Sequence, residues 1–349
     1  MIRIDEIYYN IFAKSLQHRP RVGLHWFDPF GSTAFGDICS VPRVDNIADK
    51  RLVFWDQEPL HQDRVKDFFD QYTKHYWGPT TLVTSEYNSE AVNWACDTYG
   101  LDQCYYFFHA WAALDWYRGY NRTFLSQPFL DRKIERTFLC PNNIIGGQRY
   151  HRIALLNELV DRELVDSNFI SFPERCPYEK KTVAELCKEY DIHLGHVDLP
   201  LIIDHGANHA GSSHCIDMWD LADRSLLSVV TETLYHGRRQ HLTEKAFRPI
   251  VMQQPFVLVS CRGSLEYLRR YGFKTFGEFW NEDYDDKGDD LRISRIGKLL
   301  ADLELLSVRE KAQLQRHLAP VVEHNFQWFY SQEFENLLWQ ELTGMIKQW

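Results

Sequence analysis

The stretch Leu226–Phe276, LLSVVTETLYHGRRQHLTEKAFRPIVMQQPFVLVSCRGSLEYLRRYGFKTF, contains two consecutive strand-then-helix patterns. Leu226 to Thr231 is a short apolar run rich in β-branched residues, which predicts a buried strand. Thr243 predicts the N-cap of a helix, and a second strand, Pro255 to Ser260, leads through glycine and serine into another helix that ends at Gly272. This alternation is typical of a parallel α/β sheet, which binds its ligand at the carboxyl ends of the strands.

Charged residues in this stretch gather where strands end and helices begin. Glu232 ends the first strand, and Glu244 and Lys245 stand in the first turn of the first helix, with Arg248 one turn further on. Both predicted helix N-termini point at the same edge of the sheet. Because free N–H groups and the positive dipole end attract anions, this edge predicts a site for a phosphate or diphosphate.

Glu232, followed eleven positions later by Thr243-Glu244-Lys245, resembles the donor-binding half of the α-1,3-fucosyltransferase family of glycosyltransferases. In that family a strand-end glutamate and a TEK tripeptide both sit on the nucleotide sugar, so the resemblance implies donor-binding roles for Glu232, Glu244 and Lys245. This chain departs from the family pattern by a longer and more basic insert, His236 to Gln240. The resemblance is strong over about fifty residues and partial over the C-terminal half.

A second group of cations follows the turn PNNIIGGQ, where Arg149, His151 and Arg152 begin the predicted helix YHRIALLNELVDREL. Glycines permit a close approach of the backbone to a ligand, and arginine binds two phosphate oxygens at once. A solvated basic helix start is the alternative, but cations are unfavourable beside the positive end of a helix dipole unless an anion joins them. The family resemblance implies one phosphate-binding arginine here, and both Arg149 and Arg152 remain candidates.

The chain has 349 residues, of which 44% are hydrophobic, and this is enough for two cores. Short strands alternate with helical stretches throughout, and a segment around Pro128 without clear periodicity, 124–136, predicts the linker. The resemblance implies the GT-B fold, in which two Rossmann-like domains face each other across a cleft. We therefore expect an acceptor-binding domain at 1–130, a nucleotide-sugar-binding domain at 131–330, and a C-terminal helix at 331–349 that crosses back onto the first domain.

Cysteine usage and charge favour a soluble cytoplasmic protein, in the host cytoplasm if it is viral. The eight cysteines are scattered without a C-x-x-C pair, which is typical of reduced structural thiols. The N-terminus places charges where a signal peptide needs an apolar core, and no run approaches the length of a membrane span. A net charge of −10 argues against a broadly basic surface for nucleic acid.

An inverting transferase needs a base on the acceptor side, and Glu58 in LVFWDQEPL is the first candidate. It follows a predicted strand that ends at Trp55, at the edge expected to face the second domain. Glu58 is an equally good cap for the helix that Pro59 begins. Asp56, Glu86 and His109 are the reserve candidates. The aromatic residues after His109, which include Trp111, Trp116, Tyr117 and Tyr120, have the spacing of core packing more than of a sugar platform.

Two further clusters have the composition of metal sites. The intervals between His205, His209 and His214 match no standard zinc site. Asp283-Tyr284-Asp285 has the form of a D-x-D motif but stands in a polar loop, where such clusters are usually solvated. We expect no metal and no other cofactor, with the nucleotide sugar as co-substrate. A P-loop and a G-x-G-x-x-G fingerprint are both absent, which disfavours kinases and dehydrogenases.

The sequence therefore predicts an inverting glycosyltransferase, either a hexosyl-, pentosyl- or fucosyltransferase, with a glycan hydroxyl as the acceptor. Viral or phage-type relatives of such compact transferases also glycosylate hydroxymethylated bases in DNA, which is the first alternative. A DNA acceptor requires a basic surface, and a modest lane is available near the linker from Arg118, Arg122, Arg132, Lys133 and Arg136. The second alternative is an inactive scaffold that only binds a nucleotide sugar.

Overall fold

The chain folds into two compact α/β units. The structure is a computed structural model that describes residues 22–27, 50–55, 59–75, 78–117, 128–203 and 218–347. One unit comprises Met1–Trp116, Arg238–His241 and Gln332–Trp349, and the other comprises Tyr117–Gly237 and Leu242–Ser331. Each unit has its own parallel sheet with helices packed on it, so the predicted α/β class with two Rossmann-like units is confirmed.

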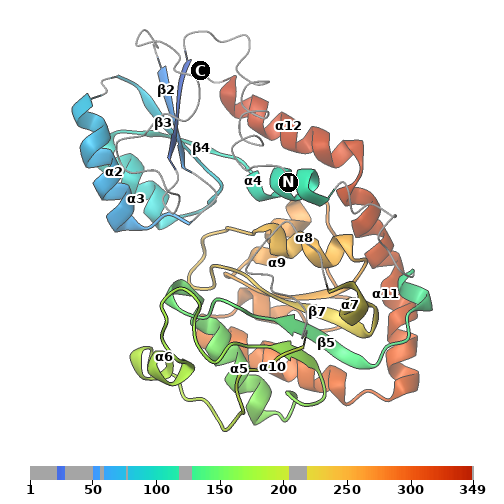
Figure 1. Ribbon diagram of the computed structural model, residues 1–349. Helices are drawn as coiled ribbons and strands as arrows, with labels where there is room; N and C mark the ends of the chain where they lie inside the picture. Colours follow the sequence, from blue (N-terminus) through green and yellow to red (C-terminus); the bar gives the residue numbers. More distant parts are fainter. Residues whose placement is uncertain are drawn as a thin grey trace. The chain divides into compact units, whose positions relative to one another are not determined.

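Unit 1 is built on a parallel sheet in the order β1-β2-β3-β4 (Figure 1). Its strands are β1 (Val22–Phe27), β2 (Lys50–Trp55), β3 (Thr80–Thr84) and β4 (Asp102–Tyr105), and its helices are α2 (Gln62–His75), α3 (Glu90–Tyr99), α4 (Phe108–Tyr117) and α12 (Gln332–Ile346). The predicted strand before Glu58, which ends at Trp55, is confirmed as β2. Because the sheet is parallel and in sequence order, the carboxyl ends of all four strands lie at one edge.

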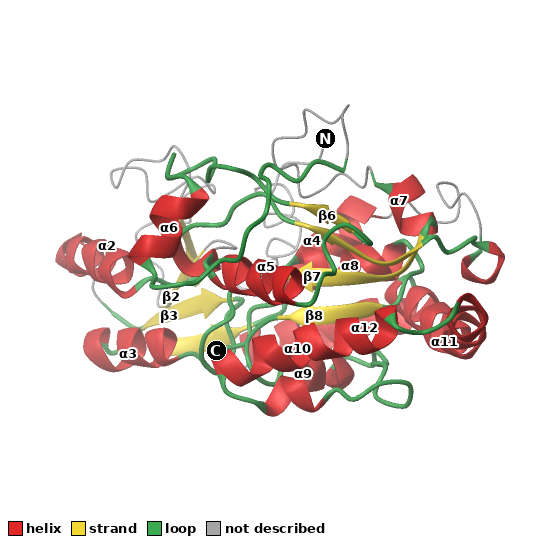
Figure 2. Cartoon of the chain, turned by 90° about the horizontal axis from the view of Figure 1, so that it is seen from below, coloured by secondary structure: helices red, strands yellow, loops and turns green. Residues whose placement is uncertain are grey.

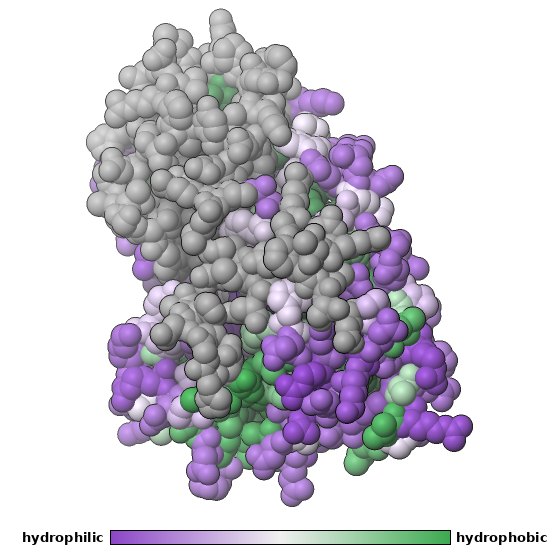
Figure 3. Space-filling model, turned by 45° about the vertical axis from the view of Figure 1, so that its right-hand side comes forward, coloured by the Kyte–Doolittle hydropathy of each residue, from purple (hydrophilic) through white to green (hydrophobic). Residues whose placement is uncertain are grey.

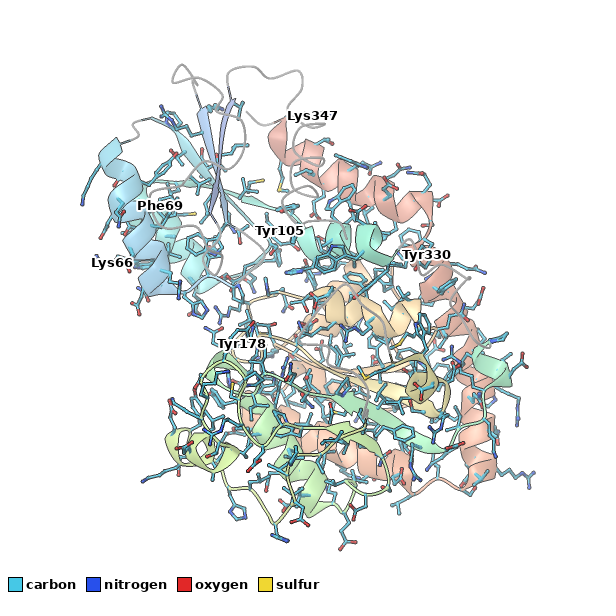
Figure 4. The ribbon with its side chains drawn as sticks, in the orientation of Figure 1. Lys66, Phe69, Tyr105, Tyr178, Tyr330 and Lys347 are labelled. Carbon is cyan, nitrogen blue, oxygen red and sulfur yellow. The ribbon has the colours of Figure 1, made fainter. Side chains whose placement is uncertain are left out.

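The core of unit 1 is aromatic. Phe68 and Phe69 on α2 are fully buried and contact each other edge to face at 4.9 Å. Lys66 lies on the outer side of the same helix (Figure 4), as the amphipathic spacing requires. Trp111 and Tyr117 on α4 are also buried, so core packing is the correct interpretation for these two residues, whereas Trp116 is partly exposed.

The C-terminal helix α12 belongs to unit 1, although the helix that precedes it, α11 (Val308–Phe329), belongs to unit 2. Trp339 packs edge to face against Trp111, with ring centroids 4.5 Å apart. Glu341 accepts a hydrogen bond of 3.0 Å from the backbone N–H of Phe107. The end of the chain therefore completes the core of the unit in which the chain begins.

Unit 2 has a parallel sheet in the order β6-β5-β7-β8 (Figure 2). The strands are β5 (Arg136–Pro141), β6 (Phe169–Ser171), β7 (Ser225–Thr231) and β8 (Phe256–Val259). The chain runs outward from β5 to β6 and then returns to β7 on the other side of β5. The neighbouring strands β5 and β7 therefore form the topological switch point, where doubly wound sheets bind ligands.

The helices of unit 2 cover both faces of its sheet. The α-helices are α5 (His151–Asp161), α6 (Val183–Glu189), α7 (Trp219–Asp223), α8 (Glu244–Val251), α9 (Ser264–Arg270), α10 (Asp289–Glu304) and α11. Figure 1 shows α5 and α10 on one face of the sheet and α8 on the other. The crossovers from β5 to β6 and from β7 to β8 run in opposite directions, so right-handed connections place α5 and α8 on opposite faces. Every helix predicted from the sequence in this unit has a counterpart at nearly the same residues.

The segment around Pro128 is not a loose linker, because its described part packs into unit 2. Arg132 is only 4% exposed. Its guanidinium pairs with Asp223 at 2.9 Å and donates to the backbone carbonyls of Met252 and Gln253. The division between the units falls earlier, between Trp116 and Tyr117. As a cation in a polar stretch, Arg132 was expected to be exposed to solvent. It is buried because its partners, Asp223 and the carbonyls of Met252 and Gln253, lie far away in the sequence.

The described surface drawn in Figure 3 is mainly hydrophilic, with smaller apolar areas. The most exposed apolar side chains are Leu305 and Val308, which flank the turn between α10 and α11. In the part of the chain that the structure describes, no helix combines the length and the apolar character needed to cross a bilayer. The described cysteines, among them Cys104 and Cys140, are free thiols.

Candidate donor site

The candidate site lies in unit 2 at the carboxyl ends of β5 and β7. Asn142 follows β5, and its side-chain oxygen accepts a hydrogen bond of 2.7 Å from Thr231, the last residue of β7. Arg152, at the start of α5, donates to the carbonyls of Ile144 and Thr231 at 2.7 and 2.8 Å. These bonds fix the two strand ends and the turn after β5 to one another. Asn142 was not predicted from the sequence, although its place between a strand and a glycine-rich turn is a usable signal.

Glu232 follows β7 directly and is completely buried. Its carboxylate accepts bonds from the backbone N–H of Thr243 at 3.0 Å and from the hydroxyl of Thr243 at 2.6 Å. Thr243 is the N-cap of α8, as predicted. Burial raises the pKa of Glu232, and Lys245 and Thr243 oppose that rise. Glu232 therefore attaches the end of β7 to the start of α8.

Glu244 and Lys245 form the first turn of α8 and differ in exposure. The side chain of Glu244 is 5% exposed, and that of Lys245 is 31% exposed. The ammonium of Lys245 lies 3.2 Å from a carboxylate oxygen of Glu244 and donates to the hydroxyl of Thr243 at 3.0 Å. Lys245 is thus a cation at a helix N-terminus, stabilised by Glu244 and still within reach of solvent.

The two candidate arginines have different environments. Arg152 is nearly buried, and its terminal nitrogens are occupied by backbone carbonyls of Ile144, Thr231 and Glu232. Burial, with a smaller effect of Arg149, lowers the pKa of Arg152 to about 10, so it remains a cation at neutral pH. Arg149 is partly exposed, and within the described ranges no hydrogen bond or ion pair engages its side chain.

Arg149 ends a short 3-10 turn, Gly147–Arg149, immediately before α5. Gly147 has a φ of +59°, a left-handed conformation that glycine adopts without strain. A side chain at Gly146 would meet only the flexible carboxylate end of Glu179, which can shift. Gly147 is therefore the glycine that sets the backbone path before Arg149.

The second predicted anion site, the N-terminus of α9, is occupied by the protein itself. Both carboxylate oxygens of Asp285 accept from the backbone N–H of Leu265, at 3.2 and 3.1 Å. The expectation of a second helix N-terminus open to a phosphate is therefore wrong for α9. It failed because Asp285 lies twenty residues after Leu265, beyond any local capping pattern. The same contact explains the D-x-D triplet, which supplies this cap.

Aromatic rings surround the start of α5. His151 is 1% exposed and stacks on Tyr235 with centroids 4.9 Å apart. Burial first, and then Arg152, holds the pKa of His151 well below its ordinary value. The guanidinium of Arg292 lies over the ring of the same Tyr235, 4.2 Å from its centroid. These contacts fix the start of α5, and thereby the position of Arg149 beside it.

The candidate bases belong to unit 1. Glu58 and Asp56 lie outside the described residues. Glu86, a reserve candidate, is completely buried and accepts bonds at 3.1 Å from the backbone N–H of Leu60 and from Arg239. His109 is also buried, and its ring meets that of His241 edge to face at 5.0 Å. Neither Glu86 nor His109 is exposed to an acceptor in this structure.

The remaining sequence candidates are also separated by the structure. His205, His209 and His214 lie outside the described residues. Among the described residues, no three histidine, cysteine or acidic side chains form a group that could hold a metal ion. Of the proposed basic lane, Arg118 and Arg122 are not described and Arg132 is buried, so the expectation of a surface role for Arg132 is wrong.

Comparisons with known proteins show only limited similarity between this chain and solved structures. No family model matches the chain, and a search of curated proteins also gave no match. A crystal structure of the DNA-modifying enzyme β-glucosyltransferase, with and without uridine diphosphoglucose, matches with a TM-score of 0.40 and 10% identity over 86% of this chain and 83% of that one. A structure of the phage T4 enzyme with UDP-glucose has a TM-score of 0.41 and 10% identity over 97% and 93% of the two chains. Likeness at this level does not place the chain in a family.

Proposed function

We propose that the chain is a nucleotide-sugar-dependent glycosyltransferase whose donor binds unit 2. The proposal rests on one observation: two solvent-accessible cations lie at the same topological switch point of the sheet. Arg149 is presented by a glycine turn after β5, and Lys245 opens the helix that follows β7. A diphosphate placed there would meet fixed positive charge and the positive end of α8. The TEK pattern of the α-1,3-fucosyltransferase family supports the same assignment.

The residues have distinct roles in this proposal. Arg149 and Lys245 stabilise charge on the departing nucleoside diphosphate, and Arg152 and Glu232 hold the elements that present them. Glu244 keeps Lys245 in place and offers an oxygen to a ribose or sugar hydroxyl. The acceptor hydroxyl gives its proton to the base, for which Glu58 remains the candidate, and its oxygen bonds to the anomeric carbon. The bond from that carbon to the diphosphate oxygen breaks, which inverts the configuration.

A thermal-shift series with nucleoside diphosphates and their sugars tests donor binding. A ligand at one hundred times its Kd stabilises the folded state by about 2.7 kcal/mol and must raise Tm. Arg149→Gln is expected to abolish the shift without changing Tm in the absence of ligand. Arg162→Gln is the matched control, because Arg162 lies at the other end of α5 and pairs with Glu158. A shift that survives in the Arg149 variant, or no shift with any nucleotide, contradicts the proposal.

Transfer of labelled sugar identifies the acceptor. We propose a glycan hydroxyl, because the net charge of −10 argues against a broadly basic surface for nucleic acid and Arg132 of the expected basic lane is buried. The β-glucosyltransferase in the comparison is DNA-modifying, so hydroxymethylated DNA is the second acceptor offered. Label on the DNA alone would overturn the glycan assignment. Nucleotide-sugar binding without transfer or hydrolysis would identify a scaffold instead of an enzyme.

A further inference from the structure

The basic insert of the donor loop, which the phosphate site does not use, forms part of unit 1. The loop between β7 and α8 runs through unit 2 as far as Gly237, and the chain re-enters unit 2 at Leu242. The four residues between them, Arg238–His241, are counted with unit 1. Gln240 pairs with Tyr87 as an antiparallel bridge, through backbone hydrogen bonds of 2.7 and 2.8 Å. This segment therefore has its backbone partner three residues after β3, within unit 1.

Glu86 is the centre of this attachment. It stands two residues after β3 and is completely buried. One carboxylate oxygen accepts from Arg239 at 3.1 Å, and the other accepts from the backbone N–H of Leu60 at 3.1 Å. Arg239 also donates to the carbonyl of Leu60, at 3.4 Å. Three segments far apart in the sequence are thus closed into one small ring of hydrogen bonds.

The segment that Glu86 holds through Arg239 leads to a residue of the proposed donor site. Arg239 comes four positions before Thr243, which caps α8 and holds Glu232. The loop is also fixed on its unit 2 side, where the carbonyl of Gly237 accepts from the N–H of Arg262. A displacement of Arg239 must therefore be absorbed by the few residues that lead to the start of α8.

We propose that Glu86 is a positioning residue that, through Arg239, fixes the segment 238–241 of the donor loop and with it the chain that leads to the start of α8. This inference rests on the proposed function for its catalytic consequence. A buried carboxylate is costly unless it is paired, and a surface ion pair at this place would contribute little. Glu86 is fully buried and is paired with Arg239, which also donates to the carbonyl of Leu60. Such a pair suits an attachment that must keep one geometry.

Hydrogen exchange tests the attachment without any assumption about activity. Glu86→Gln keeps the size of the side chain but removes its charge, and Arg239→Gln removes the other partner. Well below Tm, each variant is expected to speed amide exchange about tenfold in peptides covering 59–61 and 238–246. The effect of the double variant should be smaller than the sum of the two single effects, because both variants remove the bond between Glu86 and Arg239, while each side chain also has its own contact with Leu60. Asp70→Asn, which breaks the exposed Lys66–Asp70 pair of the same unit, is the control.

Kinetics tests the catalytic consequence. Once a donor is identified, both single variants should raise its KM or lower kcat about tenfold, although neither side chain contacts the donor. Arg239→Lys should recover part of the loss, because it restores the charge without the second bond. If Glu86→Gln does not fold, the partly exposed Arg239 carries the test alone. Lower Tm with unchanged exchange and kinetics would overturn the proposal. Faster exchange in a protein that binds no nucleotide would preserve the attachment and reject the transferase.

Discussion

At the residue scale, Lys245 combines an unfavourable position with partial exposure. A cation is electrostatically unfavourable at a helix N-terminus. Glu244, which is itself buried, offsets part of this electrostatic cost. Lys245→Ala is expected to reduce donor affinity and turnover while the fold remains intact. The loss of one phosphate contact should lower kcat/KM by roughly 30- to 1000-fold. Steady-state kinetics and Tm measured on one preparation check this, with Lys298→Ala, an exposed lysine of α10, as the control.

Glu58 remains the predicted base. Glu58→Gln should lower turnover by about 10² to 10⁴ and leave protection by the nucleotide unchanged, because glutamine cannot take the proton of the acceptor. A helix cap would behave differently, with a loss of stability of about 1 kcal/mol and near-normal turnover. In that case Asp56 is the next variant to test, since Glu86 and His109 are both buried.

His151 should make the protein sensitive to acid. Burial keeps this histidine neutral in the folded state, with its pKa well below 6.5, whereas the unfolded chain takes up a proton near 6.5. Its contribution to stability is therefore complete above pH 6.5 and is lost as the pH falls, by up to about 1.4 kcal/mol per pH unit. In His151→Phe, urea unfolding at pH 7.5 and 5.5 should show a smaller difference than in the wild type. The exposed His317 provides the control His317→Gln, and equal pH dependence in His151→Phe and the wild type would contradict the assignment.

At the element scale, helix starts have different roles although their sequences look alike. The start of α8 is closed by Thr243 and held by Glu232, with Lys245 facing solvent. The start of α9 has Gly263 at its N-cap position, without a side-chain cap, and receives Asp285 instead. Both pairs of contacts place a carboxylate at the positive end of a helix, which is favourable. The start of α8, beside the switch point, combines such a carboxylate with the accessible cation Lys245.

Removal of the cap on α9 should affect stability alone. Asp285→Asn is expected to lower the free energy of unfolding by about 1 to 2 kcal/mol, because the helix start loses its charge-assisted hydrogen bond. Donor binding should be unchanged. Denaturant unfolding measures the first quantity and thermal shift the second, with Asp290→Asn at the exposed start of α10 as the control. Loss of donor binding at full stability would place Asp285 in the site.

At the scale of the whole molecule, the chain passes four times between its two units, after Trp116, Gly237, His241 and Ser331. The last passage brings α12 into unit 1, where Glu341 and Trp339 complete the core. The two middle passages frame the segment that Glu86 and Tyr87 hold. Neither unit is a continuous piece of sequence, so a truncation at Ser331 or an excision of 238–241 would remove structure from unit 1.

Metal dependence is a property of the whole enzyme and is expected to be absent. Arg149, Lys245 and the dipole of α8 supply the positive charge that a cation would otherwise provide. Activity with the identified donor should therefore be unchanged after EDTA treatment and gel filtration. Complete loss that manganese or magnesium restores would contradict this prediction. It would direct the search to the carboxylates of Asp283 and Asp285, because magnesium prefers oxygen ligands.

The sequence by itself determined several of the strands and helices and the N-cap Thr243, because apolar periodicity and capping depend on residues a few positions apart. It also placed Arg149, Arg152, Glu232 and Lys245 at strand ends and helix starts. Only the tertiary structure separated an accessible Arg149 from a buried Arg152, and a start of α8 capped by its own Thr243 from a start of α9 capped by the distant Asp285. The partners that decide these differences are distant: Arg152 binds a carbonyl 79 residues away, Arg132 one 121 residues away, and Glu86 a guanidinium 153 residues away. Burial and pairing are set by which distant groups the fold brings together, and no local pattern in a single sequence contains that information.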